Sequence, residues 1–129
     1  MKTMPESSII PVLIYSDINE AIIWLTNTFG FQERWRIGNH RAQLSYGNGT
    51  IVVTEGTSRN SAALLIRVKN IDEHFTISKS NGAKIISSPT DQFYGERQYT
   101  VEDLDGHYWT FSQTIKDMTP EEWGATSRH

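Results

Sequence analysis

The sequence contains no cysteine, no long apolar run and no block of basic residues, and each absence narrows the possibilities. Without cysteine, the chain has no thiolate metal ligand, no cysteine nucleophile and no disulfide scaffold. No segment approaches the ~20 apolar residues that a membrane-spanning helix needs, and no apolar run of signal-peptide length follows Met1. We therefore expect a cytoplasmic protein that does not contact the membrane.

The charge and the length limit the classes further. The net charge of −3 lacks the basic patch that phosphate-backbone binding requires, so we do not expect a nucleic-acid partner. A chain of 129 residues is long enough for one compact domain that buries roughly two thirds of its surface on folding. We therefore predict a single domain over residues 1–129.

The order of predicted elements repeats within that domain. Asp17 begins a predicted helix with Glu20 in capping-box position, and Gly30 ends it. The corresponding places in the second half are held by Asn70, Glu73 and Gly82. Alternating or β-branched segments predict strands at 9–15, 31–37, 41–46 and 50–54, then at 62–68, 84–87, 97–102 and 107–112. Each half therefore has the order βαβββ, which gives modules of about 9–55 and 62–113 and a tail, 114–129.

Two connecting segments depart from simple strand-and-turn patterns. The second half is longer than the first around 88–95, which we interpret as a lengthened loop that lines a ligand site or, equally, as a neutral insertion. In the tail, Thr119 and Pro120 predict the start of a short helical turn. Trp123 is then expected to dock on the body of the protein or on a second subunit.

The duplicated order, with the segments Tyr94–Tyr99 and Asp103–Phe111, resembles the vicinal oxygen chelate superfamily of glyoxalases, bleomycin-resistance proteins and extradiol dioxygenases. The resemblance covers about 9–113 and is greatest to the small bleomycin-resistance-like proteins. Leu104 is a departure, since members usually have proline there. The resemblance implies an α+β fold in which two βαβββ modules form a curled mixed sheet around a cleft. It also implies a homodimer.

The positions that hold metal in other members contain no strong ligand here. Metal-dependent members place a His or Gln on the first strand of each module and a Glu on the last. Counting seven residues back from each helix cap and four residues on from Gly49 and Gly106, which open the last strands, gives the matching residues Ile10, Ala63, Val53 and Thr110. Three are apolar and one has only a neutral hydroxyl. We therefore predict no metal and no other cofactor.

No catalytic constellation emerges from the remaining polar residues. The four histidines, His40, His74, His107 and His129, follow no ligand spacing and are interpreted as surface or turn residues. Glu96 is a candidate general base, although an exposed loop ion pair with Arg97 is the simpler interpretation. We predict no catalytic residue.

With no metal donors, strand alternation decides what lines the predicted cleft. It directs Ile10, Val12, Ile14, Ala63, Leu65 and Arg67 inward, together with Tyr108 and Thr110, whereas Trp109 and Phe111 point toward a helix. Trp35 and Tyr94 are placed at the cleft, with plain packing as the alternative. The predicted ligand-binding residues are Ile10, Val12, Ile14, Trp35, Val53, Ala63, Arg67, Tyr94, Arg97, Tyr108 and Thr110.

These residues favour a metal-independent protein that binds a small apolar or aromatic molecule in the cleft between the modules. Tyr and Trp rings would supply buried apolar surface, and Arg67 or Arg97 would orient an acidic or carbonyl group. The family resemblance adds antibiotic sequestration as a use. The alternatives are a glyoxalase-type or dioxygenase-type enzyme of the same superfamily and a vestigial fold that serves protein contacts.

Overall fold

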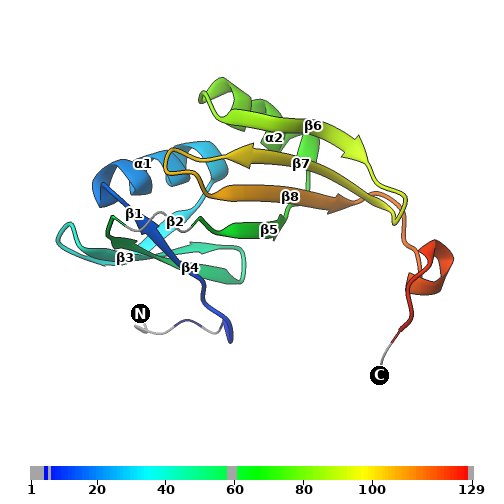
Figure 1. The fold of residues 1–129 in the computed structure, drawn as a ribbon, viewed down its shortest axis with the longest axis horizontal. Coiled ribbons are helices and arrows are strands. Elements are labelled where there is room, and N and C mark those ends of the chain that lie inside the picture. The colour runs from blue at the N-terminus through cyan, green and yellow to red at the C-terminus, as the bar shows by residue number, and fades with distance from the viewer. Residues whose placement is uncertain (1–4, 6, 58–60, 128–129) are drawn as a thin grey trace. The chain divides into compact units, whose positions relative to one another are not determined.

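The computed structural model describes residues 5, 7–57 and 61–127, which form two compact units (Figure 1). The first unit contains the described residues up to Ala62 together with the short segment Leu104–His107. The second contains Ala63–Asp103 and the described residues from Tyr108 onward. No helix within these described ranges is long and apolar enough to cross a membrane.

The first unit has one helix and one four-stranded sheet. Its elements are β1 (Val12–Tyr15), α1 (Ile18–Phe29), β2 (Gln32–Ile37), β3 (Arg41–Tyr46) and β4 (Gly49–Glu55). The strand order is β1-β4-β3-β2, with β1 parallel to β4 and the other pairs antiparallel. The predicted βαβββ order is confirmed, although β1 is shorter than the segment 9–15.

The second unit repeats this topology. Its elements are β5 (Ala63–Arg67), α2 (Ile71–Ser80), β6 (Lys84–Asp91), β7 (Glu96–Glu102), β8 (Tyr108–Thr114) and the 3-10 turn η1 (Pro120–Trp123). The strand order is β5-β8-β7-β6, again with the first and last strands of the module parallel. The α+β fold and the duplication expected from the sequence are confirmed.

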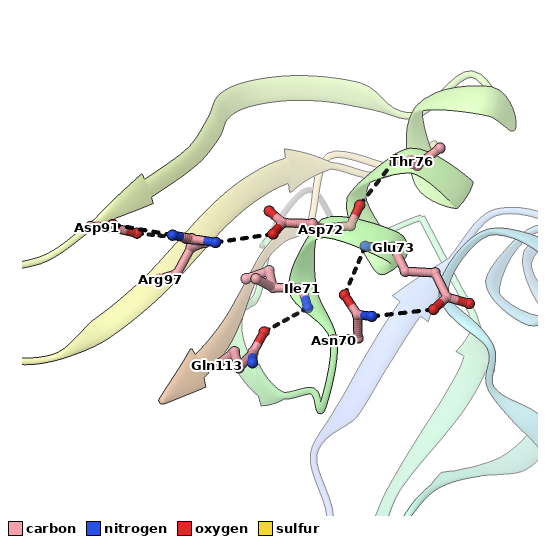
Figure 2. Close-up of polar contacts among 8 residues, drawn as sticks. All are labelled: Asn70, Ile71, Asp72, Glu73, Thr76, Asp91, Arg97 and Gln113. Carbon is pink, nitrogen blue, oxygen red and sulfur yellow. Dashed lines mark hydrogen bonds and ion pairs between the residues drawn. The ribbon is translucent and has the colours of Figure 1, made fainter. Parts of the chain in front are cut away.

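Side-chain caps begin both helices, as the sequence predicted. The Asp17 carboxylate accepts a hydrogen bond from the backbone N–H of Glu20 at 3.1 Å. The Asn70 side chain accepts one from the N–H of Glu73 at the same distance (Figure 2). These bonds satisfy N–H groups that the first helical turn leaves without an intrahelical partner. Gly30 caps the end of α1 at φ 90°, whereas α2 ends at Asn81, one residue before the predicted glycine.

Each helix covers one face of its own sheet, which we call the helix face. In the second unit, His74 of α2 lies 4.3 Å from Phe111 between ring centroids, and Ser78 hydrogen bonds to the Tyr99 hydroxyl at 2.8 Å. The buried residues of this face are Tyr99, Val101, Trp109 and Phe111. In the first unit they are Leu13, Tyr15, Ala42, Leu44, Ile51 and Val53. Burial of these side chains is the main favourable contribution to folding.

The extra length of the second half lies in a strand rather than in a loop. β6 extends to Asp91, and its pairing with β7 shifts register between Ile85 and Ser87 and again between Ser87 and Thr90. The prediction of a long loop over 88–95 was therefore wrong, because these irregularities absorb extra residues within the strand. Only 92–95 form the turn.

His107 is buried in the first unit rather than exposed on a turn. Its side chain is 1% exposed, its Nδ1 accepts the Ala62 N–H at 2.8 Å, and its Nε2 donates to the Ile14 carbonyl at 2.8 Å. The ring also packs edge-on against Tyr15 at 4.9 Å. These two hydrogen bonds attach the segment Leu104–His107 to β1 and to the start of the second half. The surface interpretation of His107 failed because the sequence did not reveal these backbone partners.

Replacing His107 with alanine is expected to destabilise the protein by about 3 kcal/mol, because it removes a buried packed ring and the side-chain partners of the part-buried Ala62 N–H and Ile14 carbonyl. Urea unfolding measures the change. His40→Ala is the matched control, since His40 has an exposed side chain paired only with Glu55 and its loss should cost about 0.5 kcal/mol or less. Equal losses for the two variants would contradict the structural role of His107.

Candidate binding face of the second sheet

The side of the second sheet that α2 does not cover is the candidate site, and we call it the opposite face. Alternation along β8 places Tyr108, Thr110 and Ser112 on this face because Trp109 and Phe111 are buried on the other. The ladder pairs place Ala63, Leu65 and Arg67 of β5 beside them. The residues that β5, β7 and β8 contribute to this face are Ala63, Leu65, Arg67, Glu96, Gln98, Thr100, Glu102, Tyr108, Thr110, Ser112 and Thr114, and Lys84 of β6 pairs with Glu102 at its edge.

One part of the opposite face offers apolar surface. Leu65 is 56% exposed and Tyr108 is 40% exposed, which is unusual for large apolar side chains within a sheet. The Tyr108 hydroxyl hydrogen bonds to Glu102, and this bond together with the carboxylate charge raises the pKa of the phenol. Thr110 and Thr100 share a hydrogen bond of 2.9 Å between their hydroxyls. An aromatic ring and an aliphatic side chain are thus presented next to hydroxyl groups.

The other part carries a continuous chain of hydrogen bonds. Tyr94 donates through its hydroxyl to Gln98 Oε1 at 3.0 Å, and Gln98 Nε2 donates to Ser112 Oγ at 3.1 Å. Ser112 Oγ in turn donates to Glu96 Oε1 at 2.7 Å. Each hydroxyl or amide in this series donates to the next residue, so Tyr94, Gln98, Ser112 and Glu96 orient one another.

Glu96 ends this chain as an ionised carboxylate. Burial opposes ionisation, but hydrogen bonds from Thr114 and Ser112 and the positive charge of Arg67 outweigh it and lower the pKa of Glu96 below its usual value of 4.5. The Glu96 side chain is 15% exposed, and Arg67 Nη2 lies 3.7 Å from its Oε1. The carboxylate is therefore mostly enclosed and largely neutralised by its neighbours.

Arg67 is an exposed cation of the opposite face beside Leu65, and Lys84, which pairs with Glu102, is another. The Arg67 Nη2 donates to Thr114 Oγ1 at 2.6 Å, while the Arg67 side chain as a whole is 62% exposed. A guanidinium has five N–H donors in a planar fork, more than these neighbours use, and carboxylates and carbonyls are its usual acceptors. Arg67 thus lies on the same strand and the same face as Leu65, and its role in ligand binding stays a prediction.

Arg97, the second predicted cation, lies on the helix face instead. Its Nε pairs with Asp91 at 2.6 Å and its Nη1 with Asp72 of α2 at 3.0 Å (Figure 2). The hydrogen bond from Arg97 lowers the pKa of Asp91, which keeps this pair charged. The predicted loop ion pair between Glu96 and Arg97 was wrong for the same reason: consecutive residues of β7 point to opposite sides of the sheet.

Val53 is a further correction. It pairs with Leu13 in the parallel ladder and with Ala42 in the antiparallel one, and all three are buried on the helix face of the first sheet. The glycine-based count placed it one residue out of phase. Its neighbour Val52, which pairs with Val12, lies on the other side.

The remaining predicted residues of the first module share the side of the first sheet away from α1. Val12 and Ile14 alternate with the buried Leu13, and Trp35 pairs with Gln43, the partner of Val52. Trp35 is half-buried, and Ile10 lies before the start of β1. Val12 and Ile14 therefore lie on the same side of the first sheet. Their role in ligand binding stays a prediction.

Sequence reasoning missed most of the polar side chains of the opposite face: Gln98, Thr100, Ser112 and Thr114. The alternation that placed Thr110 there also predicts Ser112 and Thr114 two and four residues later. Gln98 and Thr100 follow only from the β7–β8 register, which pairs them with Ser112 and Thr110. The opposite face is consequently more polar than the apolar groove expected from the sequence.

The histidines and carboxylates do not gather into a metal site. Within 5, 7–57 and 61–127, no group of three or more His, Asp or Glu residues lies close enough to hold a metal ion. His74 is half-buried with its Nδ1 2.5 Å from the Tyr99 hydroxyl, so it is a packing residue and not a surface one. His40 is exposed, as expected, and His129 lies outside the described residues.

Comparison with known proteins places this geometry in a family. The model of the glyoxalase, bleomycin resistance protein and dioxygenase superfamily matches residues 9–111. The chain therefore belongs to that superfamily, as the duplicated βαβββ order predicted. Leu104, at the position where members usually have proline, lies within the matched region.

Solved structures show the same fold. TioX from Micromonospora sp. ML1 is 31% identical, with a TM-score of 0.76 over 84% of this chain and 99% of TioX. A glyoxalase/bleomycin resistance protein/dioxygenase family enzyme from Burkholderia phytofirmans is 18% identical, with a TM-score of 0.71 over 82% of this chain and 97% of that one.

Curated relatives match over a shorter region. An uncharacterised protein of Mycobacterium tuberculosis is 28% identical over 57 residues, which are 44% of this chain and 34% of the relative. The aligned region thus spans about a third of that protein.

Replacing Glu96 with glutamine is expected to reduce stability at neutral pH and to remove part of the acid sensitivity. Because the pKa of Glu96 is lower in the folded state, its ionised form contributes stability above the usual value of 4.5 and loses it as the pH falls through the folded pKa. The difference in unfolding free energy between wild type and variant should therefore shrink below about pH 4.5. Urea titrations from pH 7 to pH 3 measure it. Glu55→Gln, at an exposed site, is the control, and a difference for Glu96→Gln that does not vary with pH would contradict the assignment.

Proposed function

We propose that the protein is a metal-independent binding protein for a small molecule that combines an apolar or aromatic body with an acidic or carbonyl group. The molecule lies on the opposite face of the second sheet. Its flat part covers Leu65 and Tyr108, and its acceptor group meets Arg67. One observation carries the proposal: exposed apolar side chains and an exposed guanidinium occur on the same face, on neighbouring strands.

The energetics favour this division of roles. Covering exposed Leu and Tyr surface contributes about 25 cal/mol per Å² of apolar area removed from water. A guanidinium–carboxylate contact contributes more to orientation than to affinity at an exposed site. Thr110 and Thr100 add hydroxyl groups that can donate to or accept from the ligand between these two ends.

Independence from metal follows from residue chemistry. Ala63 and Thr110, which match the ligand positions of the second module, are an aliphatic residue and a neutral hydroxyl, and the hydroxyl is already in a hydrogen bond with Thr100. In the first module Ile10 and Val53 are aliphatic. On this basis we propose that the protein acts as the drug-binding resistance proteins of the superfamily do, and that it sequesters an antibiotic-like compound. The homodimer expected from the resemblance stays a prediction.

Arg67→Met is expected to weaken binding of 2-naphthoate, a flat aromatic carboxylate, by about two- to fivefold, because a guanidinium–carboxylate contact at an exposed site contributes roughly 0.5 to 1 kcal/mol. Isothermal titration calorimetry measures the affinity. Binding of the neutral analogue 2-naphthamide should change little in the same variant, since its ring contacts remain.

Arg97→Met is the matched control, because Arg97 lies on the helix face and pairs with Asp72 and Asp91. It should leave the affinity for 2-naphthoate unchanged. Dialysis of the wild type against EDTA should also have no effect. A greater loss in Arg97→Met than in Arg67→Met, or an affinity that disappears with EDTA and returns with zinc, would contradict the proposal.

A further inference from the structure

The chain beyond β8 is fixed to the turn between β6 and β7. The Gly95 carbonyl accepts hydrogen bonds from the N–H groups of Ile115 and Lys116, at 2.9 and 3.1 Å. Gly95 is buried and has φ of +87°, and any side chain there would collide with the carbonyl oxygen of Lys116. Only glycine allows this close approach of two backbones. The segment after β8 therefore has a defined position on the second unit.

The tail then places an aromatic ring on the same turn. Thr119 and Glu122 form a capping box at the start of η1, and Gly124 ends it with φ of 97°. Trp123 packs against Tyr94 at 5.6 Å and against Phe93 at 6.2 Å between ring centroids. Figure 1 shows η1 next to the turn between β6 and β7. Docking of Trp123 on the body of the protein, one of the two predicted outcomes, is confirmed.

Tyr94 connects this aromatic cluster to the opposite face. Its ring contacts Phe93 at 5.1 Å and Trp123 at 5.6 Å between ring centroids, while its hydroxyl donates to Gln98 Oε1. From Gln98 the hydrogen bonds continue through Ser112 to Glu96, the neighbour of Arg67. Successive contacts thus connect Trp123 to the residues that surround the proposed ligand site.

We infer that Trp123 is a positioning residue for the binding face: by holding the Tyr94 ring, it fixes the hydrogen-bond chain that orients Gln98, Ser112 and Glu96. The inference rests on the proposed function for its effect on affinity. The coupling of Trp123 to Gln98 is a structural claim that does not depend on the proposed function. Trp123 lies in the tail, outside the region 9–111 that matches the family model.

Trp123→Leu and Tyr94→Phe test the inference by affinity for 2-naphthoate, measured by calorimetry on the full chain. Each should weaken binding by about fivefold, the effect of losing one ordered hydrogen bond. The double variant should be no weaker than either single one, because both changes break the same chain. Trp123→Phe should recover at least half of the loss. Trp24→Leu, which alters a half-buried ring on α1, is the control and should bind as the wild type does.

A second measurement needs no ligand. In the ¹H–¹⁵N spectrum, the side-chain amide of Gln98 should shift in Trp123→Leu in the same direction as in Tyr94→Phe, and should return toward its wild-type position in Trp123→Phe. An unmoved Gln98 amide in Trp123→Leu would overturn the inference, whatever the affinity. So would additive losses in the double variant, which would mean that Trp123 contacts the ligand directly. Failure of the wild type and of Trp24→Leu to bind 2-naphthoate would instead overturn the proposed function and leave the amide shifts to decide the inference.

Discussion

The candidate site depends on the alternation of side chains along β8. Trp109 and Phe111 are fully buried on the helix face, and this fixes Tyr108, Thr110 and Ser112 on the opposite face. A slip of one residue would expose two large aromatic rings and bury polar groups, which would cost several kcal/mol. Parallel pairing with β5 then imposes the same division on Ala63, Leu65 and Arg67. Core packing on one side thus determines which chemical groups the other side presents.

The same alternation separates the charges of β7 into two sets with different roles. Arg97 joins the strand to α2 and β6 through two carboxylates, and these contacts serve the fold. Glu96, one residue earlier, faces the other way and joins Ser112 and Arg67. A pair that is adjacent in sequence therefore contributes one residue to structure and the other to the candidate site. Arg97 lies on the helix face and pairs with two carboxylates, whereas Arg67 is exposed on the opposite face and can orient a ligand there.

Much of the fold could be predicted from local signals. Asp17 and Asn70 cap their helices as the sequence indicated, since a cap depends only on the residues of one turn. The alternation of Tyr108 to Phe111 was also predictable, because a single strand with one apolar face sets its own phase. Arg67, Leu65 and Thr110 were placed correctly for this reason.

The errors arose where the answer depends on partners distant in sequence. Val53 was assigned by counting from a glycine, and only the ladder with Leu13 shows its true face. His107 is buried by backbone groups of Ile14 and Ala62, which are 93 and 45 residues away. Gln98 enters the site through the β7–β8 register. Long-range pairing and irregular strands such as β6 leave no short-range pattern in the sequence, so these placements required the structure.

The most direct test of the central claim is the location of a bound ligand. Titration of ¹⁵N-labelled protein with 2-naphthoate, followed by ¹H–¹⁵N correlation spectra, reports which backbone amides change environment. We predict that the largest shifts occur in β5 and β8, over 63–67 and 108–114, and include Arg67. Shifts confined to α2 and to Arg97 and its carboxylate partners, with β5 unchanged, would contradict the assignment of the opposite face as the binding surface.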